Sequence, residues 1–185
     1  MKSSQFELLG KVALVTGGNR GIGKGIAIGL ANAGAAVAIA ARDVAKTDEA
    51  VAEIVANGGK AIGVACDVSV RASVADALAR VEAQLGGIDI VVNNAGTNAW
   101  IPNPQDLEPE GWDRVLATNL TGVYNVCVLA HPYFVKRGGG KVINISSMMA
   151  IFGGATVTAY AASKGGVDQY TKSLAVAWAK DNIQV

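Results

Sequence analysis

The chain has 185 residues, of which 51% are hydrophobic and 17% charged, with a formal net charge of +1. This composition can fill a hydrophobic core, so we predict one domain covering residues 1–185. The low charge argues against a disordered chain and against a broad nucleic-acid-binding surface. Cys66 and Cys127 lie in apolar runs without a partner at metal-ligand spacing. This argues against a disulfide framework and a zinc site, and it favours a reducing cytoplasm.

No apolar segment typical of a secretion signal opens the sequence. The most apolar stretch, 25–41, is shorter than a membrane span and is interrupted by Gly29, Asn32 and Gly34. It is interpreted as a buried helix, a turn and a buried strand. We therefore expect a soluble, cytoplasmic protein without a membrane partner.

Short β-branched runs alternate with helical stretches along the whole chain. The predicted strands are 11–16, 36–40, 61–65, 88–92 and 142–145. The predicted helices are 22–32, 43–57 with Asp43 as its cap, 69–86, 111–137 and 160–179. Strands that are apolar throughout require cover on both faces. We predict an α/β fold, a doubly wound, Rossmann-like parallel sheet, with its ligand site at the carboxyl ends of the strands.

A glycine-rich loop, Thr16-Gly17-Gly18-Asn19-Arg20-Gly21-Ile22-Gly23, follows the first predicted strand. Glycine lets the backbone come close to a phosphate, and the helix N-terminus behind the loop offers free N–H groups. A strand-to-helix turn can also need glycine for structural reasons alone. The place of the loop after the first strand favours a nucleotide site. The loop lacks the Lys-Ser/Thr pair of a P-loop, which argues against a nucleoside triphosphatase.

Five motifs in chain order resemble those of the short-chain dehydrogenases/reductases. They are the Thr16–Gly23 loop, Asp67-Val68, Asn93-Asn94-Ala95-Gly96, the N-L-x-G segment at Asn119, and Ser147 followed by Tyr160-x-x-x-Lys164. The resemblance covers essentially the whole chain and extends to 3-oxoacyl-carrier-protein reductases and to sugar or polyol dehydrogenases. It implies that the cofactor contacts are Gly17, Asn19, Arg20, Gly21, Ile22, Gly23, Arg42, Asp67, Val68, Asn94, Ala95, Gly96, Tyr160 and Lys164.

The end of the second strand discriminates between the two nicotinamide cofactors. An acidic residue there would bind the ribose hydroxyls of NAD. This chain has Ala41 followed by Arg42, and an arginine can pair with a 2′-phosphate. Arg20 adds a second positive charge, although both arginines could be ordinary surface charges and Asp43 is adjacent. We predict NADP(H), with NAD(H) as the alternative.

Tyr160 and Lys164 are four residues apart on a predicted helix, so they share one face. A free tyrosine has a pKa of about 10, and a nearby ammonium lowers it. Tyr160 is therefore predicted to be the general acid/base for a carbonyl or secondary alcohol. Ser147 follows the fifth strand, where its hydroxyl could bind the same substrate oxygen. The resemblance further implies that Lys164 holds the nicotinamide ribose and that Asn119 anchors a water in the proton path.

The remaining candidates have structural interpretations. His131, the single histidine, precedes Pro132 near the end of a predicted helix, so we expect a surface or capping role. Ser147 has no evident His/Asp partner for acyl transfer. The tryptophans, at 100, 112 and 178, are too scattered for stacking on nucleic acid and are expected to be packing residues. The first of them also lies close enough to the 93–96 motif to border a substrate pocket.

Residues 182–185 resemble the entry into a sixth strand, after which members of the family continue. We therefore predict a C-terminally short member, either a fragment or a truncated form. The substrate is not identified by the resemblance. The segments 99–107 and 148–158 are expected to border its pocket, and four large side chains in them suggest a partly apolar one: Trp100, Met148, Ile151 and Phe152.

Two hypotheses from different functional classes remain. One is an NADP(H)-dependent oxidoreductase acting on a small carbonyl or alcohol substrate, without a metal. The other is a non-catalytic dinucleotide-binding module. The resemblance also implies a homodimer or homotetramer, formed through the helices at 111–137 and 160–179.

Overall fold

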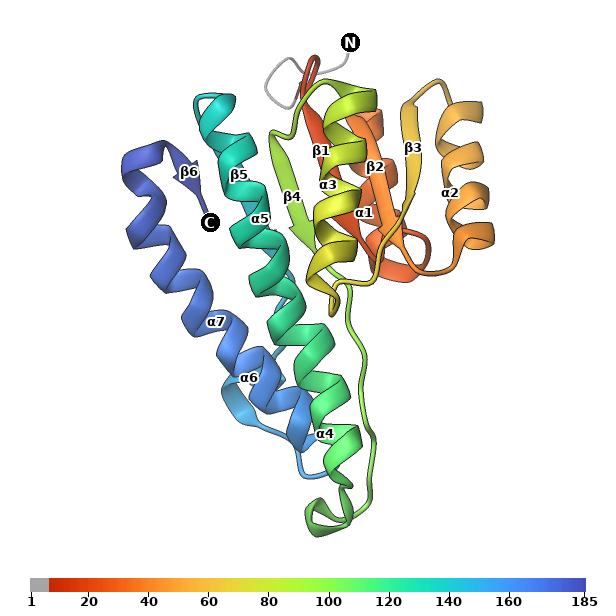
Figure 1. Cartoon of the computed structure of the whole chain (residues 1–185). Coiled ribbons are helices and arrows are strands. Elements are labelled where there is room, and N and C mark those ends of the chain that lie inside the picture. The colour runs from red at the N-terminus through yellow and green to blue at the C-terminus, as the bar shows by residue number, and fades with distance from the viewer. Residues whose placement is uncertain (1–6) are drawn as a thin grey trace.

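The structure, a computed structural model, describes residues 7–185 and is built on a parallel sheet of six strands (Figure 1). Its order is β3-β2-β1-β4-β5-β6, and every pairing is parallel. The strand order reverses between β1 and β4, so the predicted doubly wound sheet is confirmed. The strands are β1 (Val12–Thr16), β2 (Ala36–Ala41), β3 (Lys60–Ala65), β4 (Ile90–Asn93), β5 (Gly140–Asn144) and β6 (Ile183–Gln184).

Helices cover both faces of the sheet and divide the core into two layers. In β1, Leu14 packs in the layer that α3, α5 and α7 cover, and Val15 packs in the layer that α1 and α2 cover. Successive strand residues point to opposite faces, so burial on both sides requires the apolar run seen in the sequence. These helices are α1 (Gly21–Asn32), α2 (Val44–Ala56), α3 (Arg71–Leu85), α5 (Gly122–Lys136) and α7 (Thr158–Trp178).

The helix predicted at 111–137 consists of three consecutive segments. It begins as α4 (Pro109–Leu116), widens into a π-helical turn at Ala117–Thr121, and continues as α5. Apolar periodicity does not reveal one extra residue in a helical turn, so the sequence predicted a continuous helix. Such π-bulges occur often at functional sites. The segment 148–158 also contains a short helix, α6 (Met149–Phe152).

Short polar side chains set two of the helix starts. Asp43 caps α2 as predicted, because its Oδ1 accepts the Lys46 N–H at 3.1 Å. α3 begins at Arg71, two residues later than predicted. The backbone N–H and the hydroxyl of Ser69 both donate to Asp67 Oδ1, at 3.0 and 2.6 Å. This local turn competes with helix formation.

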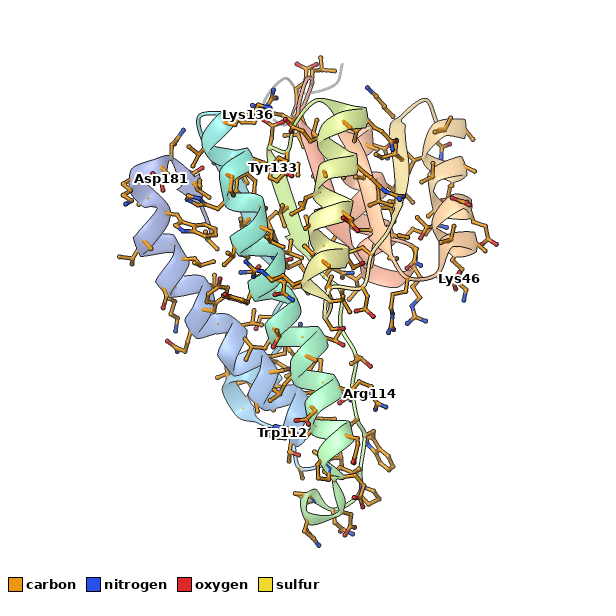
Figure 2. All side chains as sticks on the ribbon, viewed as in Figure 1. Lys46, Trp112, Arg114, Tyr133, Lys136 and Asp181 are labelled. Atoms are coloured by element: carbon orange, nitrogen blue, oxygen red, sulfur yellow. The ribbon has the colours of Figure 1, made fainter. Side chains whose placement is uncertain are left out.

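His131 joins α5 to the segment after α7. Its Nε2 lies 3.1 Å from Asp181 Oδ2, and its ring centroid lies 4.8 Å from that of Trp178. Figure 2 shows Asp181 beyond the end of α7. The contact between elements explains the histidine without a catalytic role.

The thiols of Cys66 and Cys127 are free and buried. Burial raises the pKa of Cys66 to about 11 and that of Cys127 to about 12. Both are therefore poor nucleophiles at neutral pH. Over residues 7–185, none of the helices is both long and apolar enough to cross a bilayer.

Asp89 links β1, β4 and the end of α5. Its Oδ2 accepts the Val12 N–H at 2.9 Å, and Arg137 donates to both carboxylate oxygens at 3.1 and 3.0 Å. Burial by itself raises the pKa of Asp89 and is the largest single influence on it. The hydrogen bonds and the charges of Arg137 and Lys11 together outweigh burial, so the pKa lies below its usual value.

This lowered pKa predicts a loss of stability in acid. A carboxyl group whose pKa is lower in the folded state stabilises that state above its unfolded pKa of about 3.9, and the contribution is lost as the pH falls through the folded pKa. Urea unfolding at pH 7 should show Asp89→Asn less stable than the wild type by about 2 kcal/mol. This difference in the free energy of unfolding between wild type and variant should be smaller at pH 3. A difference that does not depend on pH would contradict a lowered pKa of Asp89.

Candidate active site

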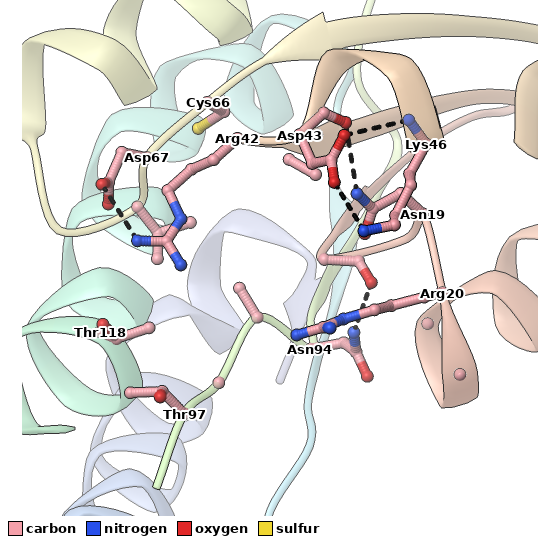
Figure 3. A pocket seen from close by; sticks show the side chains of 18 of the residues that line it. Asn19, Arg20, Arg42, Asp43, Lys46, Cys66, Asp67, Asn94, Thr97 and Thr118 are labelled. Atoms are coloured by element: carbon pink, nitrogen blue, oxygen red, sulfur yellow. Dashed lines mark hydrogen bonds and ion pairs between the residues drawn. The ribbon is translucent and has the colours of Figure 1, made fainter. Parts of the chain in front are cut away.

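A cavity of about 750 Å³ lies at the carboxyl ends of β1, β2 and β4, beside the point where the strand order reverses (Figure 3). Open α/β sheets bind ligands at this place. Twelve of the predicted cofactor residues, all except Tyr160 and Lys164, line this one cavity. Seven further lining residues were not among those predicted: Ala40, Ala41, Asp43, Lys46, Cys66, Thr97 and Thr118.

The glycine loop is held closed by Asn94. The Nδ2 atom of Asn94 donates to the carbonyl oxygens of Thr16 and Gly17, at 3.0 and 3.1 Å. Gly17 has a φ of +62°, in the left-handed region that favours glycine. A Cβ on Gly23 would lie 2.3 Å from Asn94 Nδ2 and 2.4 Å from the Gly17 carbonyl oxygen. Only glycine fits at position 23.

Thr16 also holds the two loops together, in a group of hydrogen bonds with Asn94 that we call the Thr16–Asn94 clamp. It was not among the predicted site residues. Its Oγ1 accepts the N–H groups of Asn94 and Ala95, both at 3.0 Å, and lies 3.3 Å from the Val92 carbonyl oxygen, to which it donates. Its position as the last residue of the first strand was the feature of the sequence that could have identified it as a site residue. The loop after β1 and the loop after β4 are therefore one hydrogen-bonded unit.

The N-terminus of α1 faces the cavity without a cap. Arg20 at the cap position makes no side-chain capping bond, and the first turn holds no acidic residue. Gly21, Ile22 and Gly23 of that turn line the cavity. Their N–H groups and the helix dipole favour an anion, so this donor set fits the diphosphate of a dinucleotide. The cavity volume also falls within the range of roughly 300–1,000 Å³ for small-molecule sites.

Charged side chains surround the other end of the cavity (Figure 3). Arg42 Nη1 lies 3.8 Å from Asp67 Oδ2, and the Arg42 side chain is 75% exposed. Burial alone would raise the pKa of Asp67, but the bonds from Ser69 and the charge of Arg42 together lower it. Asp43 is engaged by Lys46, whose side-chain and backbone bonds lower the pKa of Asp43. Both carboxylates are therefore ionised at neutral pH.

Lys164 is held on α7 beside the end of β5. Its side chain is buried, and its Nζ donates to the Ile145 carbonyl oxygen at 2.5 Å and lies 5.7 Å from the centroid of the Tyr160 ring. Burial lowers the pKa of Lys164, and the charge of Asp168 acts in the opposite direction. Ser147 follows β5, and its Oγ accepts the Met149 N–H at 3.2 Å.

Asn119 is fully buried in the π-helical turn and ties three segments together. Its Oδ1 accepts the Thr97 N–H at 2.8 Å, and its Nδ2 donates to the Thr97 carbonyl oxygen at 2.9 Å. The same Nδ2 lies 3.1 Å from Ser163 Oγ, which donates to the Tyr160 carbonyl oxygen at 2.7 Å. The side-chain amide is thus used within the protein. Thr97 belongs to none of the motifs, so the sequence did not predict its role. Ser163 lies between the motif residues Tyr160 and Lys164 and was not predicted either.

A second series of side-chain hydrogen bonds joins α7 to the sheet. Asn93 Nδ2 donates to Asn144 Oδ1, and Asn144 Nδ2 donates to Thr171 Oγ1, both at 2.8 Å. Satisfied polar networks of this kind make the packing of the elements they join more rigid. The two bonds connect the ends of β4 and β5 to α7, the helix that carries Tyr160 and Lys164.

The interpretation of Trp100 as a packing residue was wrong. Trp100 is 67% exposed, and Trp112, which is labelled beside α4 in Figure 2, is 38% exposed. Trp178 does pack against the core layer of α5 and α7. A single sequence does not separate buried from exposed tryptophans, because burial depends on which elements pack around the side chain.

The chain is similar to proteins named as dehydrogenases over almost its whole length. The family model described as short chain dehydrogenase matches residues 11–185. The 2-dehydro-3-deoxy-D-gluconate 5-dehydrogenase of Escherichia coli K12 is 39% identical over 185 residues, which cover 98% of this chain and 71% of that protein. The gluconate 5-dehydrogenase of Gluconobacter oxydans is 36% identical over 180 residues, which cover 97% of this chain and 70% of that protein.

A solved structure of a dehydrogenase has the same fold as this chain. The crystal structure of a gluconate 5-dehydrogenase from Burkholderia cenocepacia, in complex with NADP and tartrate, superposes with a TM-score of 0.93 at 39% identity. The match covers 98% of this chain and 71% of that one. The chain belongs to the short-chain dehydrogenase family, whose members are NAD(P)-dependent oxidoreductases acting on CH–OH groups.

Proposed function

We propose that this chain transfers a hydride between NADP(H) and a small carbonyl or secondary-alcohol substrate. The observation that carries the proposal is a hydrogen-bonded path from the cavity to the helix of Tyr160. Thr97 lines the cavity and bonds Asn119, which bonds Ser163, which in turn bonds the Tyr160 carbonyl oxygen. The cavity wall and the helix that carries Tyr160 are therefore joined by hydrogen bonds, which supports a common site.

The proposed cofactor contacts follow the charges around the cavity. The N–H groups of the first turn of α1 would bind the diphosphate, and Asp67 with Val68 would contact the adenine. Arg20 and Arg42 would pair with the 2′-phosphate, because Ala41 leaves no carboxylate at the end of β2 to bind free ribose hydroxyls. The relative from Burkholderia cenocepacia was crystallised with NADP, which supports NADP(H) as the cofactor of this chain.

When bound, the cofactor supplies the hydride in reduction and accepts it in oxidation. In the proposed mechanism the Tyr160 hydroxyl gives its proton to the substrate carbonyl oxygen, or takes a proton from the alcohol in the reverse direction. Ser147 Oγ donates a hydrogen bond to the same oxygen. Lys164, held by the Ile145 carbonyl, is proposed to favour the phenolate of Tyr160 and to bind the nicotinamide ribose.

We propose that Asn119 anchors a water in the proton path through its backbone. Its side-chain amide is already engaged by Thr97 and Ser163. A homodimer or homotetramer formed through α4, α5 and α7, a cytoplasmic location, and a single domain all stay predictions.

Separate titrations with NADPH and NADH test the proposed function. Binding is followed by tryptophan fluorescence and checked by calorimetry, and turnover of ketones is followed by NADPH oxidation. We expect micromolar binding with a preference for NADPH, together with ketone reduction. Binding without turnover of any ketone would support the non-catalytic dinucleotide-binding module. A folded protein that binds neither cofactor would contradict both hypotheses for this chain.

Arg42→Ala is expected to weaken NADPH binding by about tenfold or more, because a hydrogen bond to a charged group contributes roughly 1.5–3 kcal/mol. NADH, which has no 2′-phosphate, should bind the variant as it binds the wild type. Calorimetric titration with both cofactors measures the two effects. Arg71→Ala, on α3 and outside the cavity lining, is the matched control. Equal weakening for NADPH and NADH would show that Arg42 does not recognise the phosphate.

A further inference from the structure

We infer that the substrate is an uncharged ketone or secondary alcohol with an apolar or aromatic body, and not a sugar acid. The inference rests on the proposed function, since it concerns the molecule that Ser147 and Tyr160 would hold. It is carried by two properties of the segments that follow β4 and β5. One property is their lack of positive charge, and the other is their exposed apolar side chains.

The two segments meet beside the proposed acid/base residue. The segment 94–108 leaves β4 through Thr97 in the cavity wall, and the segment 145–160 leaves β5 through Ser147 and ends at Tyr160. A backbone hydrogen bond of 3.0 Å from the Ile101 N–H to the Thr156 carbonyl oxygen joins them. A substrate between cofactor and Tyr160 would therefore have side chains of both segments as neighbours.

Neither segment carries a positive charge. Residues 94–108 and 145–160 contain no lysine, arginine or histidine, and their only charged residues are Asp106 and Glu108. A substrate carboxylate would lose water there without gaining a partner, which is unfavourable for an ion. The two acidic residues would add repulsion.

Within residues 7–185, the cations on elements next to these segments have other positions or partners. Arg20, Arg42 and Lys46 lie at the cofactor cavity, where the first two are proposed to bind the 2′-phosphate. The buried ammonium of Lys164 donates to the Ile145 carbonyl oxygen. Arg114 is exposed on α4 and projects to the side opposite α6 in the view of Figure 2.

Four large apolar side chains in the two segments are exposed. Trp100 is 67% exposed and Met148, the residue after Ser147, is 64% exposed. Ile151 and Phe152 on α6 are each 76% exposed. Burying such side chains against an apolar ligand is favourable in proportion to the area removed from water. Aromatic and methionine side chains suit rings and alkyl chains.

This specificity differs from that named for the similar proteins. The relatives from Escherichia coli and Gluconobacter oxydans are named for gluconate or a dehydrated gluconate, both sugar acids. The shared core accounts for the common cofactor chemistry. The segments after β4 and β5 assign this chain to neutral substrates.

A matched pair of methyl ketones tests the inference. 2-Octanone and 7-oxooctanoate have the same chain length, and only the second carries a carboxylate. With saturating NADPH, we expect kcat/KM for 2-octanone to exceed that for 7-oxooctanoate, and that for 5-keto-D-gluconate, by about tenfold or more. A higher kcat/KM for either acid would overturn the inference and leave the proposed function intact.

Two charge-adding variants locate the effect. Ile151→Arg or Phe152→Arg is expected to shift the ketone ratio towards 7-oxooctanoate by about tenfold, since each places a cation on α6 at an exposed position. Val55→Arg, at a 53% exposed position on α2, is the control and should leave the ratio unchanged. An unchanged ratio in both α6 variants would overturn the inference. The inference would also be overturned if an α6 variant changed the sedimentation coefficient and left the ratio of kcat/KM values unchanged, because a second copy of the chain would then cover α6.

A failure of the proposed hydride transfer can be distinguished from a failure of the inferred substrate class. If no ketone oxidises NADPH, binding of the two methyl ketones to the NADPH complex is measured by calorimetry. Tighter binding of 2-octanone would keep the substrate class while the hydride-transfer proposal fails. Equal binding, or none, would overturn the inference.

Discussion

Replacing Tyr160 by phenylalanine is expected to lower kcat by about 10²- to 10⁴-fold, the usual contribution of a general acid/base. The change removes one hydroxyl oxygen and leaves the ring beside Lys164. The backbone bond from Ser163 to the Tyr160 carbonyl is also unaffected. Helix α7 should therefore stay in place, and calorimetry should find the Kd for NADPH within about threefold of the wild type, well under 1 kcal/mol.

The control for this variant is Tyr124→Phe. Tyr124 lies on α5 and is 45% exposed, and it does not line the cofactor cavity. The same atom is removed there, so turnover should be unchanged. Retained turnover in Tyr160→Phe would overturn the assignment of Tyr160. Lost NADPH binding in that variant would instead indicate that the hydroxyl supports the cofactor site.

Gly23→Ala is expected to have the largest effect on the cofactor cavity. The added Cβ would lie 2.3 Å from Asn94 Nδ2 and 2.4 Å from the Gly17 carbonyl oxygen. Asn94 and the loop must then move apart, which breaks the bonds that hold the glycine loop closed. We expect NADPH binding to weaken by about a hundredfold and the free energy of unfolding to fall by about 1–3 kcal/mol.

Gly25→Ala on the same helix is the matched control. A Cβ there would meet no atom within 4 Å, so the substitution should raise the free energy of unfolding by about 0.5–1 kcal/mol. NADPH binding should be unchanged. Denaturant unfolding and calorimetric titration of both variants check these expectations. Unaltered NADPH binding in Gly23→Ala would show that the closed loop is not needed for the cofactor.

Local features of this protein could be predicted from the sequence because their causes lie within a few residues. Apolar runs between helical stretches indicated the parallel sheet, and Asp43 was identified as the cap of α2 from its position alone. The residues of the Thr16–Gly23 loop and of the strand ends were expected to meet because the carboxyl ends of parallel strands share one edge. Most of the loop residues, with Arg42, Asp67 and Asn94 from other strand ends, do line one cavity, whereas Gly18 and Ser147 are not among its lining residues.

Features that depend on contacts distant in sequence were decided by the tertiary structure. The Thr16–Asn94 clamp joins residues 78 positions apart, and Asn119 bonds Ser163 across 44 positions. The π-helical turn places Asn119 between Thr97 and α7. The exposure of Trp100 likewise depends on which elements pack around it. The sequence by itself determined which elements form and which motifs end the strands, since propensity and spacing are local. Only the tertiary structure decided which polar groups satisfy one another, because a hydrogen bond depends on distance in space.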